Sequence, residues 1–480
     1  MESKGPQLRG VLKSWIYEFS GGVMSAELFK YKNLDEVLKA RGGPVKLLRS
    51  STLGPYVFPG VPPEYTNWRA EQQAWKNSTA LLNLSYHMRD LYLTGPDVLR
   101  LLSKVGLNKF GDFPKNRGKQ IIAASHDGYL IGDGICFHTS DDVYRVVGPP
   151  MISDWVEFHA ETGGFDVKIE TDEALSVRSG DPKIFIYQVQ GPMALDLVSD
   201  ASGGTLPDIR FFHIGEFSIQ GCAVRALRHG MAGAPGFEIF GPWKDHQKVL
   251  SALEKAGEKY HLHKVGALAY PTTTLESGWM PLPCPAIYHS DEMKPYREWM
   301  TPMHLEVLGS LGGSFVSDNI VDYYMDPAEV GYGQFIDFSK DFIGKEALAQ
   351  KVKNPRRKKV TLVWDEEDVL EVMHHSLYTN GSASKFMNLP LAVYSTFQYD
   401  EVVKDGKAAG ISQYVGFSSN AQAMLSLSLV NIEFSEPGTE VVVRWGEPNT
   451  QRPTVERNSV HEIRAKVAQA PYFQKLIKHG

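Results

Sequence analysis

One structural unit occurs twice in this chain, and it constrains the fold more than any other feature of the sequence. Each copy is an apolar strand, then Gly-Pro, then an amphipathic helix, and the copies span residues 91–103 and 187–199. A looser third copy covers residues 237–253. Proline suits the first turn of a helix because its missing N–H would have no partner there. The two clear copies lie 96 residues apart, from Gly95 to Gly191, and predict two related α+β subdomains.

The last quarter of the chain has a different pattern. Short segments alternate between apolar and polar residues in the manner of β-strands, and they are residues 360–364, 410–416, 423–430 and 440–445. A basic run, residues 354–359, precedes them and is typical of a solvated linker. We therefore predict an α+β core over residues 33–353, made of two interleaved subdomains, and a C-terminal β-barrel with a tail over residues 354–480. Residues 1–32 are interpreted as an N-terminal leader and a candidate for disorder.

Composition excludes several classes of function. The 480 residues carry a net charge of −6, with a pI near 6.2, which argues against nucleic-acid binding. No apolar run is long enough to cross a membrane. Three scattered cysteines (Cys136, Cys222 and Cys284) fit a reducing cytoplasm. We expect a cytoplasmic protein, monomeric or a small homo-oligomer, that acts on a small molecule.

The sequence contains no motif typical of a metal-binding or nucleotide-binding site. The histidine pairs 261/263 and 374/375 lack thiol or carboxylate companions at ligand spacing. Neither Gly-x-Gly-x-x-Gly nor the phosphate-loop signature occurs, and residues 132–134 (Gly-Asp-Gly) are interpreted as a tight turn. We expect a reaction without a metal, a flavin or a nucleotide.

The segment 228–239 (Arg-His-Gly-Met-Ala-Gly-Ala-Pro-Gly-Phe-Glu-Ile) is the most informative for function. Small residues precede an apolar strand that contains one carboxylate, Glu238. A buried carboxylate needs a partner, and a flat heterocycle with two parallel N–H donors would provide one. The alternative is a Gly-rich turn with a glutamate on the wet face of an edge strand.

Four motifs in this order resemble the aminomethyltransferase (glycine-cleavage T-protein) family of folate-binding enzymes. They are Gln190-Gly191-Pro192, the 228–238 segment, a run from Gly266 to Gly278 and residues 342–348. The family resemblance implies a folate-binding core in a three-domain cloverleaf with a C-terminal β-barrel. Tyr270 stands where the aminomethyl branch has arginine, and Met231-Ala232 replaces Tyr-Thr. The similarity is greater to tetrahydrofolate-dependent aryl O-demethylases, through segments such as Ser277-Gly278-Trp279 and Gly312-Gly313-Ser314-Phe315.

This resemblance implies transfer of an aryl ether methyl group to N5 of tetrahydrofolate. A phenolate then leaves, so the site needs a proton donor near the ether oxygen. Tyr270 is the candidate donor and His87 its relay or orienting partner. Each has a structural alternative: Tyr270 could be a core aromatic, and His87 could cap the strand that follows it.

The candidate cofactor-binding residues are Glu238, Gln188, Trp279 and Arg228. Glu238 would bind the pterin edge. Gln188 is favoured over Gln190 as the glutamine that faces the ligand. Trp279 would either stack on the pterin or belong to the core.

Substrate-binding candidates are Tyr56, Phe58 and Gly148. Vanillate demethylases resemble this chain but have arginine near Gly148 and tyrosine at Phe58. The pocket is therefore expected to be less polar and to take another methoxyarene, such as a chlorinated methoxybenzoate (dicamba) or syringate. Alternatives from other folate relatives are demethylation of a sulfonium or amine, aminomethyl transfer, or folate binding without catalysis.

Overall fold

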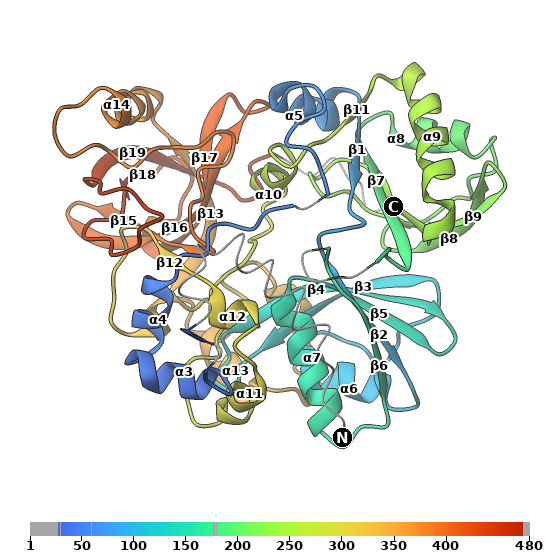
Figure 1. Cartoon of the computed structure of the whole chain (residues 1–480), viewed down its shortest axis with the longest axis horizontal. Coiled ribbons are helices and arrows are strands. Elements are labelled where there is room, and N and C mark those ends of the chain that lie inside the picture. Colours follow the sequence, from blue (N-terminus) through green and yellow to red (C-terminus); the bar gives the residue numbers. More distant parts are fainter. Residues whose placement is uncertain (1–26, 29, 59, 176–177, 179, 474–480) are drawn as a thin grey trace.

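The computed structural model describes residues 27–28, 30–58, 60–175, 178 and 180–473. Most of the predicted leader, residues 1–26, lies outside these described residues. Two β-sheets and a closed β-barrel lie around a common centre, with helices on their outer faces (Figure 1). This mixed architecture with a C-terminal barrel confirms the predicted fold class.

The first sheet has six strands in the order β11-β1-β7-β10-β9-β8 and is antiparallel except for the β1–β11 pair. Its strands are β1 (Thr79–Asn83), β7 (Ile184–Gln190), β8 (Ile214–Ile219), β9 (Cys222–Arg228), β10 (Gly236–Pro242) and β11 (Leu262–Lys264). Helices α8 (Ala194–Ala201) and α9 (His246–Gly257) pack on its outer face. Helix α8 buries Ala194, Leu197, Val198 and Ala201, the spacing of a single apolar helix face.

The second sheet is formed by chain inserted between β1 and β7. Its five antiparallel strands have the order β3-β4-β5-β2-β6. They are β2 (Arg89–Thr94), β3 (Arg117–Ala124), β4 (Leu130–Ser140), β5 (Val143–Gly148) and β6 (Lys168–Asp172). The helices that share its outer hydrophobic core are α3 (Leu34–Arg41), α4 (Pro44–Ser50), α6 (Val98–Val105), α7 (Pro150–Thr162), α11 (Lys294–Trp299), α12 (Leu305–Leu308) and α13 (Lys345–Lys353).

The repeated Gly-Pro unit has the same geometry in both sheets. Gly95 follows β2 and Gly191 follows β7, with φ angles of 128° and 130°. A Cβ atom would lie 2.4 Å from the carbonyl oxygen of Asp166 at the first glycine, and 2.4 Å from that of Ser78 at the second. Only glycine combines this backbone conformation with so close an approach. The repeat therefore predicted the strand-to-helix connections of the two sheets.

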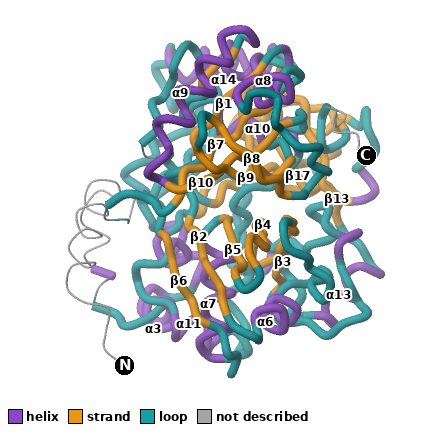
Figure 2. The backbone as a smooth tube through the Cα atoms, turned by 90° about the vertical axis from the view of Figure 1, so that its right-hand side faces the viewer, coloured by secondary structure: helices purple, strands orange, loops and turns teal. Residues whose placement is uncertain are grey.

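The inner faces of the two sheets point toward each other (Figure 2). Phe137 of β4 packs edge-to-face on Phe240 of β10, with ring centroids 5.8 Å apart. Both rings belong to one buried cluster that also contains Leu82, Leu227 and Tyr270. Residues carried on these inner faces can therefore reach a common site.

The barrel closes in the order β13-β17-β16-β15-β18-β19. Its strands are β13 (Arg357–Trp364), β15 (Asp400–Lys404), β16 (Lys407–Ser418), β17 (Ala423–Asn431), β18 (Glu440–Trp445) and β19 (His461–Ala468), with α14 (Glu366–Leu377) beside them. Each of the four predicted segments lies in one of these strands. The boundary between residues 353 and 354 stays a prediction.

The interpretation of residues 354–359 as a solvated linker was wrong from Arg357 onward, while residues 354–356 are exposed and precede the strand. Arg357 begins β13 and is buried, and its guanidinium donates two hydrogen bonds of 2.9 Å to the carboxylate of Glu329. Lys359 lies in the same strand and donates to the Gly278 carbonyl at 2.6 Å. Arg357 and Lys359 therefore attach the start of the barrel to the core, and Arg357 is paired because a buried charge needs a partner.

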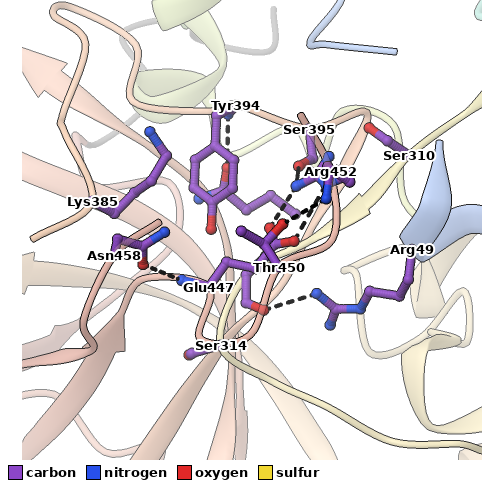
Figure 3. Close-up of polar contacts among 12 residues, drawn as sticks. Arg49, Ser310, Ser314, Lys385, Tyr394, Ser395, Glu447, Thr450, Arg452 and Asn458 are labelled. Carbon is purple, nitrogen blue, oxygen red and sulfur yellow. Dashed lines mark hydrogen bonds and ion pairs between the residues drawn. The ribbon is translucent and has the colours of Figure 1, made fainter. Parts of the chain in front are cut away.

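A second contact between core and barrel surrounds the segment 310–315 (Figure 3). There β12 (Leu311–Gly312) pairs in parallel with β14 (Phe397–Gln398). Arg452 and Glu447 form a buried ion pair of 2.5 Å, and Arg452 also donates to Ser395 Oγ at 2.8 Å. A Cβ atom on Gly312 would lie 2.0 Å from that Oγ. The Gly-Gly sequence therefore permits the close approach of the two units.

Candidate active site between the two sheets

Tyr270 and His87 form a direct hydrogen bond. Tyr270 is the first residue of a 3-10 helix (Tyr270–Thr272), and its backbone N–H donates to the Gly266 carbonyl at 3.0 Å. His87 lies in the turn before β2. The Tyr270 hydroxyl and His87 Nε2 are 2.8 Å apart, although 183 residues separate them in the sequence. Each residue is only 8% exposed, so the pair is held in a nearly dry environment.

Burial fixes the protonation of this pair. It lowers the pKa of His87 to about 4, against the opposing effect of the Glu238 carboxylate. Burial, aided by Glu238, raises the pKa of Tyr270 well above its ordinary value. At neutral pH the imidazole is therefore uncharged and the phenol keeps its proton. In the tautomer with a proton on Nδ1, His87 Nε2 accepts the hydrogen bond from Tyr270.

Aromatic side chains enclose the pair. The Phe58 ring is edge-to-face with Tyr270, at a centroid distance of 4.7 Å, and with His87 at 5.4 Å. Tyr56 packs on Phe58 at 5.2 Å, and its hydroxyl donates to the backbone carbonyl of His87. The structure thus brings Tyr56 and Phe58, the two predicted substrate-binding aromatics, beside the predicted catalytic residues.

Glu238 lies on β10, directly opposite Gln188 of β7. Its Oε2 is 3.1 Å from His229 Nε2, and its Oε1 is 3.7 Å from Nη2 of Arg145. Burial acts to raise the pKa of Glu238, but the hydrogen bond from His229 and the nearby Arg145 hold it below its ordinary value. The carboxylate is therefore ionised at neutral pH and can accept two N–H donors.

Gln188 and Gln190 point to the same face of β7, as alternate residues of a strand do. Gln190 uses its Oε1 to accept the backbone N–H groups of Met231 and Ala232, at 2.8 and 3.2 Å. Gln188 donates from Nε2 to the His229 carbonyl at 3.0 Å, and its buried Oε1 has no partner among the described residues. Gln190 thus shapes the 230–236 turn, while Gln188 keeps a free acceptor beside Glu238.

A polar corner missed by the sequence analysis is centred on Asp133. The carboxylate Oδ2 accepts Trp279 Nε1 and the Tyr332 hydroxyl, both at 2.9 Å, and Gln120 Nε2 at 3.4 Å. Burial raises the pKa of Asp133 despite these hydrogen bonds. The interpretation of residues 132–134 as a tight turn was wrong, because they lie inside β4, between β3 and β5. Asp133 faces the inter-sheet space on the same side of β4 as Phe137.

Two predicted site residues offer the site no side chain. Arg228 pairs with Phe237, so it is on the opposite face of the sheet from Glu238, and its Nη1 donates to the Ile209 carbonyl at 2.7 Å. A Cβ atom on Gly148 would meet Ile152, Asp133 and Gly134 at 2.9–3.0 Å, which leaves no room for a side chain. The structure thus turns Arg228 away from Glu238, whereas Gly148 pairs with Arg89 at the start of β2, two residues after His87.

Arg145 and His229 are the other site residues that the sequence analysis did not identify. Arg145 is a charged residue within the apolar strand β5, and that pattern was the available signal. His229 was inside the informative segment but carried no motif of its own. Both lie next to Glu238, so their importance depends on the pairing of strands distant in sequence.

Several other features can be stated for the described part of the chain. It contains no group of three or more His, Cys, Asp or Glu side chains placed to hold a metal ion. None of its helices is long and apolar enough to cross a bilayer. The three cysteines are buried and unpaired. A reaction without metal stays a prediction.

Comparison with known proteins now decides the family. Residues 5–283 match the family model described as the GCVT N-terminal domain, which covers more than half of the chain. The chain belongs to the aminomethyltransferase family. Within that family it is 43% identical to syringate O-demethylase from Sphingobium sp. (strain NBRC 103272 / SYK-6), over 92% of this chain and 96% of that protein.

The chain is also similar to two other proteins at lower identity. Sesamin methylene transferase from Sinomonas sp. (strain No.22) is 29% identical, over 87% of this chain and 91% of that protein. The crystal structure of the glycine cleavage system aminomethyltransferase T from Bartonella henselae superposes with a TM-score of 0.59. It covers 92% of this chain and 97% of its own at 16% identity, and so supports the fold.

Proposed function

We propose that this protein is a tetrahydrofolate-dependent O-demethylase of aryl methyl ethers. The observation that carries the proposal is the buried Tyr270–His87 hydrogen bond of 2.8 Å, enclosed by aromatic rings and close enough to Glu238 to be affected by its charge. The 43% identity to syringate O-demethylase supports the same reaction class.

The reaction breaks the bond between the methyl carbon and the ether oxygen and forms a bond from that carbon to N5 of tetrahydrofolate. The N5 proton is lost and the phenolate gains one, so the products are 5-methyl-tetrahydrofolate and a phenol. Tetrahydrofolate supplies the nucleophile when bound. The protein's part is to hold both reactants in line, exclude water and manage the proton.

Residues at the site match these tasks. Glu238 and the unpaired Oε1 of Gln188 offer acceptors for the N–H groups of a pterin edge, and these buried atoms fit such a ligand. Tyr270 stays protonated and can donate to the departing phenolate oxygen, while His87 orients its hydroxyl. Asp133, with a raised pKa, is the candidate acceptor for a proton from the cofactor side.

We propose a methoxybenzoate as substrate, with syringate the first candidate and a chlorinated methoxybenzoate the second. The phenyl ring of Phe58 stands beside Tyr270, so this side of the pocket lacks the hydroxyl expected in vanillate demethylases. A cation in place of Gly148 would have no room for its side chain. Vanillate should therefore be the poorer substrate.

Anaerobic incubation with tetrahydrofolate and a panel of syringate, dicamba and vanillate tests the proposal. We expect 5-methyl-tetrahydrofolate and the corresponding phenol, with syringate or dicamba turned over faster than vanillate. Activity that requires oxygen or NADH would contradict the mechanism. Vanillate as the best substrate would contradict the proposed pocket while leaving the mechanism intact.

A further inference from the structure

Arg145 is the most deeply buried cation on the inner faces of the two sheets. It lies in β5, is 1% exposed, and faces the six-stranded sheet across the inter-sheet space. Its guanidinium carbon is 4.2 Å from the centroid of Phe137 and 4.8 Å from that of Phe240. These two rings come from different sheets, so the guanidinium is held between them by cation–π contacts.

Two carboxylates, one from each sheet, flank this guanidinium. Nη1 is 3.5 Å from Oδ1 of Asp90 on β2, and Nη2 is 3.7 Å from Oε1 of Glu238 on β10. Both contacts are longer than a charge-assisted hydrogen bond, so each carboxylate keeps capacity to accept another donor. Arg145 therefore supplies charge to Glu238 without occupying its oxygen.

We propose that Arg145 is the positioning residue that holds the Glu238 carboxylate ready for the two N–H donors of the pterin. The proposal rests on the proposed function, since it assigns Glu238 to tetrahydrofolate. Arg145 itself touches neither reactant in this scheme. It acts through Glu238 and through the sandwich of Phe137 and Phe240.

The groups around Glu238 show why Arg145 is needed. Among the described residues, the titratable or charged groups coupled to its charge include Arg145 on β5, His229 before β10, His87 before β2, Asp90 on β2 and Tyr270 in the 3-10 helix. Among these groups, Arg145 alone is permanently cationic. Without it, Asp90 and Glu238 would be two buried carboxylates with no cation between them.

Replacement of Arg145 by methionine should make tetrahydrofolate binding sensitive to pH. An opposite charge at this range lowers a carboxyl pKa, so its loss should raise the pKa of Glu238. A protonated Glu238 can no longer accept two N–H donors. The affinity of Arg145→Met for tetrahydrofolate should then fall as the pH is lowered, by about tenfold per pH unit below the new pKa.

The experiment measures the Kd of tetrahydrofolate by anaerobic calorimetry between pH 5.5 and 8.5, for the full-length wild type and for the variant. The wild-type affinity should be nearly constant, and the acid limb of Arg145→Met should lie at higher pH. Arg145→Lys, which keeps the charge, should restore the wild-type profile in part. The KM for the aryl ether should be unchanged, because Arg145 acts on the cofactor side.

Arg178→Met is the matched control. Arg178 is also a cation in this region, but it pairs with Asp172 Oδ1 at 3.0 Å and not with Glu238. Its removal should leave the pH dependence of tetrahydrofolate binding unchanged. If Arg145→Met does not fold, Asp90→Asn/Arg145→Met removes the second buried carboxylate while keeping Glu238, and should still show the raised acid limb.

The two proposals fail in different ways. A wild type that binds no tetrahydrofolate at any pH would refute the proposed function and this inference together. A wild type that binds, with the same pH profile for the wild type and the folded arginine variants, would refute the role of Arg145 alone.

Discussion

Replacement of Tyr270 by phenylalanine removes one hydroxyl and tests the proposed proton donor. The ring is buried against Phe58 and His87, so phenylalanine can keep both edge-to-face contacts. The change leaves His87 Nε2 without its donor, which costs about 1–3 kcal/mol of folding free energy. General acid catalysis contributes about 10²- to 10⁴-fold. This corresponds to about 3–5 kcal/mol of transition-state stabilisation.

The expected result is therefore a large loss of kcat in a protein that remains folded. Single-turnover formation of 5-methyl-tetrahydrofolate under anaerobic conditions measures the chemical step directly. Tyr187→Phe is the matched control, because Tyr187 lies on β7, on the opposite face of the six-stranded sheet from Gln188 and Glu238, and its hydroxyl donates to the His246 carbonyl at 3.2 Å. A loss for Tyr270→Phe below about tenfold would refute the assignment, since that is less than a general acid supplies.

Three further predictions concern Asp133, His87 and the core–barrel contact. Asp133→Asn should lower kcat by about 10²-fold, as loss of a general base does, and leave the KM of syringate unchanged, measured by steady-state kinetics. His87 has a pKa of about 4 in the folded protein and about 6.5 in the unfolded chain, so as the pH falls the unfolded chain binds this proton first. The free energy of unfolding should therefore fall by about 3 kcal/mol between pH 6.5 and pH 4. Urea denaturation at a series of pH values measures this fall, and His87→Gln should remove it. Arg452→Met should lower the free energy of unfolding by about 3–5 kcal/mol, because it leaves the buried Glu447 carboxylate without its cationic partner. Adding Glu447→Leu should recover most of that loss.

Local chemistry made much of the fold predictable. The Gly-Pro repeat marks the two places where a strand turns into a helix against a neighbouring backbone, and only glycine fits there. Alternation predicted the barrel strands because their inner residues must be apolar and their outer residues need not be. The basic run before the barrel was interpreted as a linker, because the sequence alone does not show that Arg357 pairs with Glu329.

The candidate site was predictable only in part. Family resemblance singled out Tyr270, His87 and Glu238, but the hydrogen bond of the first two depends on long-range packing. Arg228 was assigned to the folate side because strand register, which decides the face, cannot be read from one strand. Asp133 was overlooked because its flanking glycines indicate a turn. The structure shows why residue 134 is a glycine, since a Cβ atom there would lie 2.5 Å from the Val147 carbonyl oxygen of the adjacent strand.

The destination of the ether methyl group is what distinguishes methyl transfer to tetrahydrofolate from oxidative demethylation. Anaerobic incubation with syringate carrying deuterated methoxy groups and unlabelled tetrahydrofolate, followed by mass spectrometry, tests this directly. We predict that the intact trideuterated methyl group is found on 5-methyl-tetrahydrofolate, in amounts equal to the phenol formed. Release of the label as formaldehyde, or a phenol without labelled 5-methyl-tetrahydrofolate, would contradict the account.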